Sequence, residues 1–411
     1  MTPKLLQNCG KCGLCLYVCP VYKIIKEEQS SPRGKLQLIK AHENNTLASS
    51  PLLKEIVSKC LMCGSCSANC PSGINHYSKF MEMRKKMVEA QGEEPAIKSL
   101  IYLLSREYRL KFGAGLARAG QKIIPDYFAK NYKLGNIPLK NFPKLNSIPF
   151  RKTNDEVILP DKEQIGTLVY FTGCATNYLY DDTGFSFIEI LKHMGYKIII
   201  PKDQVCCSIP LLFHGAAYKA LKNITTNINV LKNLDADRIL VDCSTCGEAL
   251  KNEYPRMIEN EDHDPFEANK IASKVMDALS FIDENFDRLE FDTNMREKIS
   301  VTYHAPCHTK NSFGSNIIIE NLLQKLPFVN YKRTPDVDEC CGGGGTFFYE
   351  HPEVSKIMMD KKIKNAKAVK ASIWLTDCPV CRMNLAGNLN DNDNLQVLHP
   401  LNLIASALKP L

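Results

Sequence analysis

The sequence of 411 residues lacks the segments that would place a protein in or across a membrane. No stretch approaches the ~18 consecutive apolar residues of a membrane-spanning helix, and the most apolar runs are short ones such as YKIIIP and SIPLLFHG. The opening residues MTPKLLQNCGKC contain no basic segment followed by an apolar core, which argues against a secretory signal. We therefore expect a cytoplasmic protein that reaches the inner face of a membrane only through a partner.

Nucleotide-binding motifs are missing as well. The glycine run CGGGGTFF has no Lys-Ser/Thr after it, as a P-loop would, and it is not the GxGxxG of a dinucleotide site. The net charge of +7 is spread through helical segments such as DKKIKNAKAVK, without an aromatic-interleaved basic patch. These absences argue against flavin, nicotinamide and nucleic-acid sites in this chain. Docking to an acidic partner or a membrane surface stays open.

Cysteine, in contrast, is abundant, with 18 residues. In a reducing compartment, thiols persist as metal ligands rather than as disulfides. Eight of them form two runs of the pattern C-x2-C-x2-C-x3-C-P, and the second run repeats the first at a distance of 51 residues. The runs consist of Cys9, Cys12, Cys15 and Cys19, and of Cys60, Cys63, Cys66 and Cys70.

This pattern resembles the bacterial ferredoxin run, in which three close cysteines bind one 4Fe–4S cubane and the fourth binds the other. A zinc ribbon needs two pairs of ligands and has no use for four staged thiols followed by proline. The resemblance implies two cubane clusters with crossed fourth ligands. One would use Cys9, Cys12, Cys15 and Cys70, and the other Cys60, Cys63, Cys66 and Cys19.

The remaining ten cysteines form a second repeat, with copies 133 to 135 residues apart. The residues around them agree, since GTLVYFTGC in one copy matches ISVTYHAPC in the other, and Asp242 matches Asp377. All 18 cysteines are thereby used, which argues against chance. The copies consist of Cys174, Cys206, Cys207, Cys243 and Cys246, and of Cys307, Cys340, Cys341, Cys378 and Cys381.

Five thiols in each copy exceed the four that a tetrahedral zinc accepts. Adjacent cysteines, such as Cys206 and Cys207, cannot easily chelate one small ion together, whereas a multi-iron cluster can receive them on different irons or through a bridging sulfur. Four glycines follow Cys341, and such a run is costly to order unless the backbone passes close to something bulky. We therefore predict that Gly342, Gly343 and Gly344 contact the cofactor.

The spacing C-x31-CC-x35-C-x2-C, with one extra residue in each of the two long gaps of the second copy, resembles the cysteine-rich "CCG" domain. That family includes the catalytic subunit of heterodisulfide reductase and the iron–sulfur subunits of glycolate oxidase, lactate-utilisation enzymes and anaerobic glycerol-3-phosphate dehydrogenase. The resemblance implies one or two noncubane 4Fe–4S clusters in the two copies. Ser208 stands where the family has glycine, so a different cluster fit, a zinc ion or an ordinary cubane at the first copy stays open.

Smaller segments refine the resemblance. SPRGKLQLIKA and HPEVSKIMMDKKI are similar to the glycolate and lactate oxidoreductase subunits, whereas DCPVCRMNL is more similar to relatives of the heterodisulfide reductase D-type subunit. The layout of that subunit and of the glycolate-oxidase type, an N-terminal ferredoxin module fused to two CCG domains, covers nearly the whole chain.

The predicted fold is α/β with an N-terminal α-helical two-cluster ferredoxin module. The two CCG domains are expected to have parallel sheets flanked by helices, because strand-like runs such as YKIIIP alternate with helical ones such as FSFIEILKHMG. The expected segments are a ferredoxin-type domain at 1–90, a helical segment and Pro-rich linker at 91–165, and CCG domains at 166–290 and 298–411. In the second segment an amphipathic helix precedes a linker without periodicity at about 125–162.

Two oxidoreductase functions follow from the resemblance. In the first, the chain is an electron-transfer subunit: a FAD-containing partner oxidises a 2-hydroxy acid (glycolate or lactate) or glycerol 3-phosphate, and electrons pass toward a quinone or another acceptor. In the second, the chain itself reduces a disulfide at noncubane clusters held by Cys206, Cys207, Cys340 and Cys341. We favour the first. A zinc scaffold is a third possibility, which the ferredoxin runs make improbable.

Charged and titratable neighbours of the cysteines invite further roles. Hydrogen bonds to cluster sulfur or proton transfer are conceivable for the histidines, but we expect them to be satisfied neighbouring or surface groups and assign none as catalytic. They are His214, His304 and His308. Three lysines near the cysteines, equally compatible with a solvated role, would raise reduction potentials: Lys11, Lys59 and Lys310.

Overall fold

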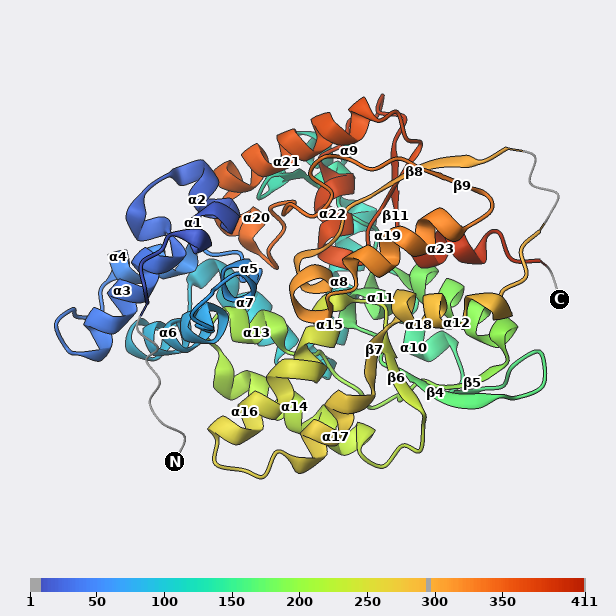
Figure 1. Cartoon of the computed structure of the whole chain (residues 1–411), viewed down its shortest axis with the longest axis horizontal. Coiled ribbons are helices and arrows are strands. Elements are labelled where there is room, and N and C mark those ends of the chain that lie inside the picture. Colours follow the sequence, from blue (N-terminus) through green and yellow to red (C-terminus); the bar gives the residue numbers. More distant parts are fainter. Residues whose placement is uncertain (1–8, 293–296, 410–411) are drawn as a thin grey trace.

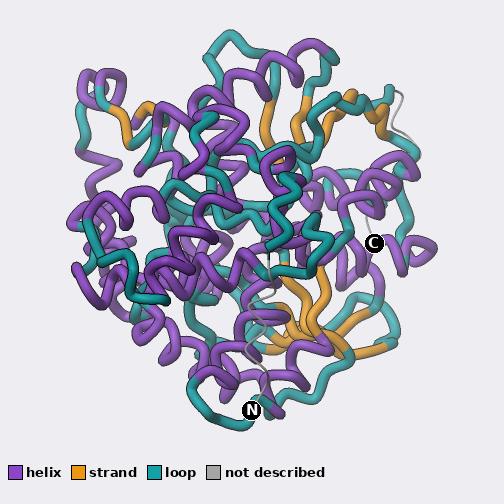
Figure 2. The backbone as a smooth tube through the Cα atoms, turned by 60° about the vertical axis from the view of Figure 1, so that its left-hand side comes forward, coloured by secondary structure: helices purple, strands orange, loops and turns teal. Residues whose placement is uncertain are grey.

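The computed structural model describes residues 9–292 and 297–409, as a helical N-terminal region and two α/β units, each with its own sheet (Figure 1). The strands form two main groups with helices around each of them (Figure 2). The helical and α/β parts follow the chain in the expected order.

The N-terminal region winds short helices around its two cysteine runs, and proline at the first turn together with serine caps starts several of them. The internal repeat extends to the backbone, because Lys11 and Met62 share a φ near +50° (53° and 52°), and Gly13 and Gly64 are left-handed as well. The elements are α1 (Leu14–Val18), α2 (Pro20–Ile25), η1 (Glu28–Ser30), α3 (Pro32–Glu43), α4 (Pro51–Ser58), α5 (Ser65–Ala68) and α6 (His76–Gln91).

The expected amphipathic helix is two helices, α7 (Pro95–Leu104) and α8 (Glu107–Ile123), which meet at Ser105 and Arg106. α7 buries Ile97 and Ile101 against the rest of the chain. α8 has no buried residue among those described and leaves apolar side chains such as Phe112 exposed.

The segment expected to be an irregular linker contains short elements that tie the two α/β units together. Asn136 donates its backbone N–H to Phe348 of the second unit, and Asn146 donates to the carbonyl of Tyr178 in the first. The linker prediction missed this structure, because two-residue strands leave no periodicity to read. The elements are α9 (Asp126–Asn131), β1 (Lys133–Leu134), β2 (Ile137–Pro138), η2 (Leu139–Asn141), α10 (Phe150–Thr153) and β3 (Val157–Ile158).

The first α/β unit has a five-stranded sheet of order β3-β5-β4-β6-β7. Four strands are parallel, as predicted, but β3 of the linker joins antiparallel to β5 at the edge, with Val157 opposite Ile199. The strands are β4 (Gly166–Tyr170), β5 (Tyr196–Ile199), β6 (Arg238–Val241) and β7 (Val275–Asp277). The helices are α11 (Cys174–Tyr178), α12 (Asp181–Met194), α13 (Ile209–Phe213), α14 (Ala217–Leu231), α15 (Ser244–Glu248), η3 (Ala249–Glu253), α16 (Tyr254–Asn260), α17 (Phe266–Lys274), α18 (Ala278–Glu284) and η4 (Phe286–Arg288).

The second α/β unit has an entirely parallel four-stranded sheet of order β11-β10-β8-β9. This order matches β7-β6-β4-β5 of the first unit, so the sequence repeat is a repeat of topology. The strands are β8 (Ile299–Tyr303), β9 (Val329–Tyr331), β10 (Ile373–Leu375) and β11 (Gln396–Leu398). The helices are η5 (Thr309–Phe313), α19 (Asn316–Lys325), α20 (Phe347–Glu350), α21 (Pro352–Ala368), α22 (Pro379–Gly387) and α23 (Pro400–Ala405).

Three apolar clusters join the parts. One contains Val57 and Phe80 of the N-terminal region together with Ile224 of the first unit. Another joins the two sheets, and a smaller one joins Leu61 of the N-terminal region to Met358 of α21 in the second unit. Figure 1 shows α2 beside α21 at this junction, and their residues are in contact. The cysteines of each part are thereby held against those of the next.

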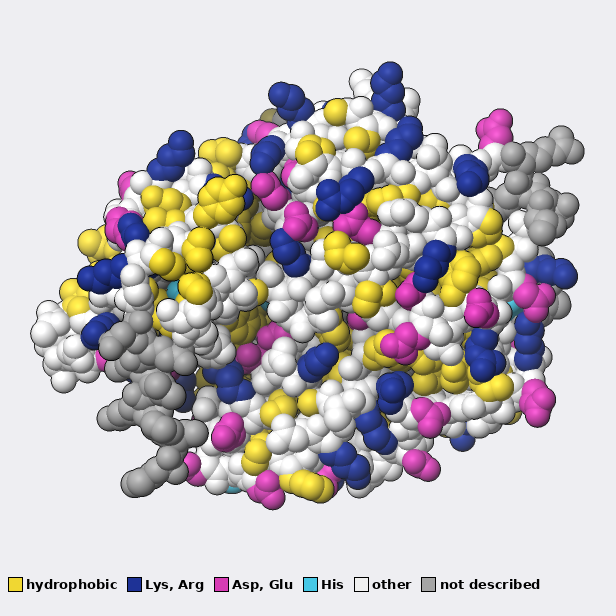
Figure 3. All heavy atoms as spheres, viewed as in Figure 1, with side chains coloured by type: hydrophobic (Ala, Val, Ile, Leu, Met, Phe, Trp, Pro, Cys, Tyr) yellow, Lys and Arg dark blue, Asp and Glu magenta, His cyan; other side chains and the backbone are white. Residues whose placement is uncertain are grey.

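The surface adds two observations. In the described part of the chain, no helix combines the length and apolarity that crossing a bilayer requires. On the face shown in Figure 3, Lys and Arg side chains are scattered among acidic ones rather than gathered in a single patch.

Candidate metal centres

In both α/β units the cysteines lie beyond the carboxyl ends of parallel strands. Cys174 and Cys243 follow β4 and β6, and Cys307 and Cys378 follow β8 and β10. The adjacent cysteine pairs lie in the loops that follow β5 and β9. Open parallel sheets place binding sites at this edge, because loops from several strands meet there.

The five thiols of the first unit form one series of neighbouring side chains. Cys206 contacts Cys174 on one side and Cys207 on the other, Cys207 contacts Cys246, and Cys246 contacts Cys243. The neighbouring thiols of Cys206 and Cys246 lower the pKa of Cys207. This group is called the first centre.

The second centre consists of the five thiols of the second unit. Cys341 lies next to Cys340 and Cys381, and Cys381 next to Cys378, close enough for each to shift the pKa of its neighbours. Cys307 lies close enough to Cys378 and Cys341 for them to raise its pKa, after the larger effect of burial. The structure therefore brings together both predicted sets of five.

The two centres adjoin each other at Cys243 and Cys378, whose side chains lie close enough to shift each other's pKa. These two residues occupy equivalent positions in the two copies, the first cysteine of each CxxC. The copies thus meet back to back at matched positions, which spacing in the sequence did not predict.

In the N-terminal region, four of the eight thiols line one cavity among α2, α3 and α6: Cys19, Cys60, Cys63 and Cys66. This is the set predicted for one of the two cubanes. Burial raises the pKa of Cys19 to about 12, and the nearby thiols Cys63 and Cys60 act in the same direction. Cys9 and Cys12 both contribute to a raised pKa at Cys15, after burial. Cys70 follows α5 and is half-buried. Its assignment to the same cluster as Cys9, Cys12 and Cys15 stays a prediction.

The N-terminal region also adjoins the second centre. Cys63 raises the pKa of both Cys307 and Cys340, behind burial and, for Cys340, behind the larger effects of Cys341 and Cys307. A cavity of about 400 Å³ opens between these three cysteines and is flanked by Lys310 and Lys362. The thiol groups therefore follow one another from the N-terminal region to the second centre and then to the first.

Behind each centre lies a buried carboxylate, Asp242 in the first copy and Asp377 in the second. The sequence shows these two residues only as equivalent positions of the repeat. Tyr170 donates its hydroxyl to Asp242 at 2.7 Å, and Tyr303 donates to Asp377 at 2.6 Å. A threonine hydroxyl donates to each carboxylate as well, from Thr176 and Thr309 respectively. Burial raises the pKa of Asp377 to about 7. These bonds fix the start of each CxxC loop.

Lys35 is a further residue that the sequence analysis missed. Its side chain is 2% exposed, and its ammonium donates to the carbonyls of Ser30 (2.8 Å) and Lys59 (2.7 Å). Burial lowers its pKa, while the thiols of Cys60 and Cys19 act in the opposite direction. The cavity lined by the four thiols of the N-terminal region thus has a buried cation at its wall. In the sequence, the only indication of a role for Lys35 is its position within SPRGKLQLIKA, the segment that resembles glycolate and lactate oxidoreductase subunits.

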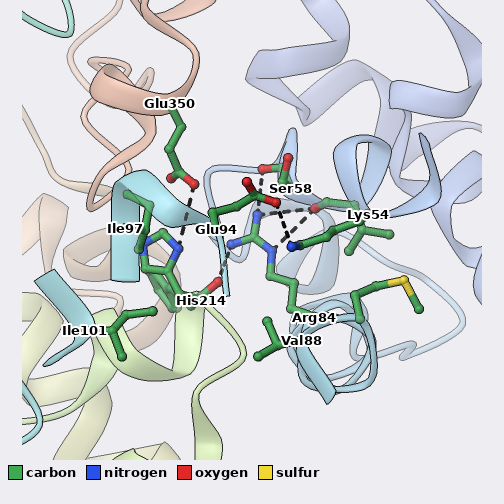
Figure 4. Close-up of a pocket in the computed structure, with 12 residues that line it drawn as sticks. Lys54, Ser58, Arg84, Val88, Glu94, Ile97, Ile101, His214 and Glu350 are labelled. Atoms are coloured by element: carbon green, nitrogen blue, oxygen red, sulfur yellow. Dashed lines mark hydrogen bonds and ion pairs between the residues drawn. The ribbon is translucent and has the colours of Figure 1, made fainter. Parts of the chain in front are cut away.

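Arg84 holds the same loop from α6. Its guanidinium donates to the carbonyls of Val57, Ser58 and Cys60, and to that of Phe213 in the first unit. Figure 4 shows it at the wall of a pocket where α4, α6, α7 and both α/β units meet. The sequence offered no pattern for it, because its partners are backbone atoms.

The glycines after Cys341 contact the chain itself at close range. Gly342 has a φ of +79°, and a side chain there would lie 2.9 Å from the carbonyl oxygen of Ser355. A side chain at Gly344 would lie 2.5 Å from Leu61. The amide of Gly342 also reaches the sulfur of Cys340 at 3.3 Å. Packing against the backbone of Ser355 therefore explains Gly342, and side chains crowd Gly344, whose φ is +45°. The cofactor contacts of Gly342, Gly343 and Gly344 stay a prediction.

Ser208, the departure from the family pattern, adopts the same backbone as glycine does in the other copy. Its φ is +75°, against +79° for Gly342. Its hydroxyl reaches the carbonyls of Cys206 and Ala220 at 3.4 Å each. The loop around the first centre is therefore built alike, at the expense of a left-handed serine.

We expected the three histidines to lie at the surface or to have hydrogen-bond partners, and His304 differs from this expectation. His308 contacts Thr245 and Met62, and His214 contacts Thr346 at 2.7 Å, so both have partners. His304 is 1% exposed, and neither ring nitrogen makes a well-formed hydrogen bond to any described residue.

The lysines expected near the cysteines are largely paired. The side chain of Lys59 bonds Glu55 at 2.7 Å, and that of Lys310 bonds Asp338. Lys11 offers its carbonyl oxygen to Arg33.

The chemistry of these side chains fits iron–sulfur clusters. All 18 cysteines are free thiols, and most of the ten in the two centres are buried. Burial disfavours the thiolate unless a positive charge compensates it, and metal ligation supplies that charge. Five convergent thiols in each centre exceed the demand of a single tetrahedral ion.

Comparison with known proteins agrees with this arrangement. Residues 5–74 match the 4Fe-4S dicluster domain, and residues 168–251 and 301–386 match the cysteine-rich domain. The chain is 24% identical to the probable glycolate oxidase iron-sulfur subunit of Bacillus subtilis, over 92% of this chain and 88% of that protein. It is 24% identical to the glycolate oxidase iron-sulfur subunit of Escherichia coli, over 98% and 95%.

A second kind of relative comes from methanogenic archaea. The chain is 25% identical to the D-type subunit of the dihydromethanophenazine:CoB–CoM heterodisulfide reductase of Methanosarcina mazei, over 95% of this chain and 90% of that protein. Both kinds of relative are oxidoreductase subunits whose length this chain nearly spans. The chain therefore belongs to the iron–sulfur oxidoreductase subunits that combine a 4Fe-4S dicluster domain with two cysteine-rich CCG domains.

Proposed function

We propose that this chain is the electron-transfer subunit of a complex in which a FAD-containing dehydrogenase subunit oxidises glycolate, lactate or glycerol 3-phosphate. Electrons then leave the chain toward a quinone or another acceptor, which a membrane-bound partner would bring close. The names of the glycolate oxidase relatives support the choice of substrate class.

The proposal includes two cubane 4Fe–4S clusters in the N-terminal region and one or two noncubane 4Fe–4S clusters in the two centres. Such clusters supply groups that accept and release one electron at a time. One cubane set is Cys19, Cys60, Cys63 and Cys66, and the other is Cys9, Cys12, Cys15 and Cys70. The second centre uses Cys307, Cys340, Cys341, Cys378 and Cys381, and the first uses Cys174, Cys206, Cys207, Cys243 and Cys246.

The observation that carries the proposal is the unbroken order of thiol groups through the chain. Cys63 adjoins Cys307 and Cys340, and Cys378 adjoins Cys243. Closely spaced groups of this kind suit the movement of single electrons between two ends of the molecule, where partners dock.

The surrounding residues hold the members of this series in place. Arg84 fastens the Cys60 loop to the first unit, and Asn311 of the second unit donates to the carbonyl of Cys63 at 2.7 Å. The cysteine pairs lie among buried apolar side chains such as Ile209 and Trp374. Burial excludes water from the sulfurs and holds the groups at fixed separations.

The test is isolation of the tagged chain from its own host without oxygen. We expect a flavin-containing subunit to co-purify, about 16 irons per chain if every site holds four, and dye reduction that depends on a hydroxy acid or glycerol 3-phosphate. Cys378→Ser should lower both the iron content and the dye reduction and leave the flavin content of the complex unchanged. A preparation without flavin partner or substrate-dependent reduction would contradict the proposal.

A second candidate is disulfide reduction by the chain itself, which the contact between two complete five-thiol centres favours. The chain would then resemble its heterodisulfide reductase relative from Methanosarcina mazei. Cys206, Cys207, Cys340 and Cys341 would be the ligands next to the reaction. Disulfide reduction by the iron-loaded chain alone, with an artificial electron donor, would support this candidate, and its absence would remove it.

A further inference from the structure

The two centres differ in one buried side chain that follows directly on the first strand of each copy. His304 follows β8 and donates its backbone N–H to Leu375 at 2.8 Å. Phe171 follows β4 and makes the same backbone bond to Leu240 at 3.0 Å. Both side chains are fully buried, at 1% and 0% exposure. The backbone is therefore the same in both copies, and only the chemistry of the side chain differs.

His304 is directed at the thiols of the second centre. One of its ring nitrogens and the sulfurs of Cys341 and Cys381 all lie within 4.8 Å of one another. His304 also contributes to the lowered pKa of Cys341, behind the larger effects of Cys340 and Cys381. Phe171, in contrast, packs in the apolar cluster that contains the cysteines of the first centre.

Within residues 9–292 and 297–409, neither nitrogen of His304 makes a well-formed hydrogen bond. A buried polar group without a partner costs free energy, so it calls for an explanation such as a bound ion or ligand. Packing does not explain it, because a phenylalanine fills the same place in the other copy. The imidazole therefore points to the group that the second centre binds.

We propose that His304 is a sixth contact residue of the second centre, donating a ring N–H to sulfur at the Cys341–Cys381 edge and giving this centre a higher reduction potential than the first. The inference rests on the proposed function in one respect, namely that both centres hold iron–sulfur clusters. It goes beyond that function by assigning unlike potentials to two centres with the same thiol set.

The physical reason lies in the charge that reduction adds to the sulfurs. A hydrogen bond to a ligand or cluster sulfur stabilises the more negative, reduced form and raises the potential. Neutral imidazole carries one N–H donor, whereas phenylalanine has none. Lys362, whose pKa responds to Cys341 and Cys340, also distinguishes the second centre, so the test changes His304 alone.

The experiment is a redox titration of the full-length, iron-loaded chain, followed by EPR and visible absorption without oxygen. His304→Phe should lower one midpoint potential by about 59 mV or more, a tenfold change in the one-electron equilibrium constant, and leave the others unchanged. Phe171→His is the matched variant and should raise a different midpoint. Pulsed EPR of the wild-type chain should detect a weakly coupled nitrogen that His304→Phe removes.

Iron content and the stability of the metal-free chain separate the possible failures. We expect His304→Phe to keep its full iron content and to melt, without metal, at the same temperature as wild type or higher. Unchanged midpoint potentials in the iron-loaded His304→Phe variant would overturn the inference and leave the proposed function intact. A lower melting temperature of the metal-free variant would have the same consequence, because His304 would then serve only to stabilise the fold. A wild-type chain without iron at the second centre would overturn both.

Discussion

The two cysteine-rich units have the same strand order and the same five-thiol pattern, yet their centres have different neighbours. The second centre faces the N-terminal region through Cys63 and has a histidine beside its sulfurs. The first centre lies at the far end of the series and has Phe171 at that place. The comparison shows that a duplicated scaffold can keep its ligand geometry while the surroundings of each copy diverge.

The largest effect is expected where the two copies share a backbone conformation but have different residues, at Gly342 and its counterpart Ser208. Gly342→Ala adds a side chain at φ +79° against the backbone of Ser355, which lies within 3.0 Å of the new Cβ. We expect a loss of about 3 kcal/mol or more in unfolding free energy, from strain together with overpacking. The midpoint of urea unfolding measures it.

Ser208→Ala is the matched control, since that position already accommodates a Cβ at φ +75°. Its expected effect is below about 1 kcal/mol. Equal losses in the two variants would show that the loops of the two copies are not built alike.

The attachment of the N-terminal loop to each unit gives the next largest effect. Arg84→Met removes donors from four backbone carbonyls, including those of Cys60 and Phe213, and should cost about 3 kcal/mol and loosen iron binding. Asn311→Ala removes the bonds from the second unit to Cys63 and Ser65 and should cost about 1 kcal/mol. Chemical unfolding with iron analysis measures both, and a larger loss in the second variant would reverse the expected order.

His214 and its counterpart Phe348 predict a difference in acid sensitivity. Burial and the charge of Arg84 lower the pKa of His214 to about 3, below the ~6.5 of an unfolded chain. The unfolded chain therefore binds the extra proton, and stability falls as the pH drops from about 6.5 toward 3. At pH 5 the loss amounts to about 2 kcal/mol.

His214→Phe should remove this part of the pH dependence. The free energy of unfolding is measured for wild type and variant at pH 7 and at pH 5. The quantity compared is the change in this free energy between the two pH values. Parallel curves for the two proteins would show that His214 is not held neutral.

The buried carboxylates give the smallest effect. In the second copy the hydroxyls of Tyr303 and Thr309 bond different oxygens of Asp377, whereas in the first both bond the same oxygen of Asp242. Tyr303→Phe should therefore lower the free energy of unfolding by about 1 kcal/mol more than Tyr170→Phe does. The reason is that it leaves one carboxylate oxygen of Asp377 without its hydrogen-bond donor, whereas the bonded oxygen of Asp242 keeps the donor Thr176. Thermal unfolding of the two variants checks the order, and equal shifts would argue against it.

Much of the architecture could be predicted from the sequence. The strand-like segments before Cys174 and Cys307 form β4 and β8, and the two ferredoxin-like runs lie among short helices. Local patterns were sufficient there, because alternation and proline placement act over a few residues. The strand β3 was missed, since two residues gain their strand conformation only from the neighbour at the sheet edge.

The candidate centres show the same division. The sequence groups ten cysteines into two sets of five, and the structure places the members of each set near one another. That these sets bind metal stays a prediction. It offered no sign of Arg84, whose partners are backbone carbonyls remote in sequence, and for Lys35 it offered only the position within SPRGKLQLIKA. It also assigned the glycines after Cys341 to a cofactor alone, although Ser355 and Leu61 occupy the space beside them.

By itself, the sequence determined that the chain repeats and that its cysteines recur at matched spacings, and it predicts that they bind metal, because the number and spacing of thiols restrict their chemistry. Only the tertiary structure decided the order of the centres, through the contacts of Cys63 with Cys307 and of Cys243 with Cys378. The physical reason is that such contacts arise from the packing of whole units against each other. That packing depends on apolar surfaces spread over the entire chain.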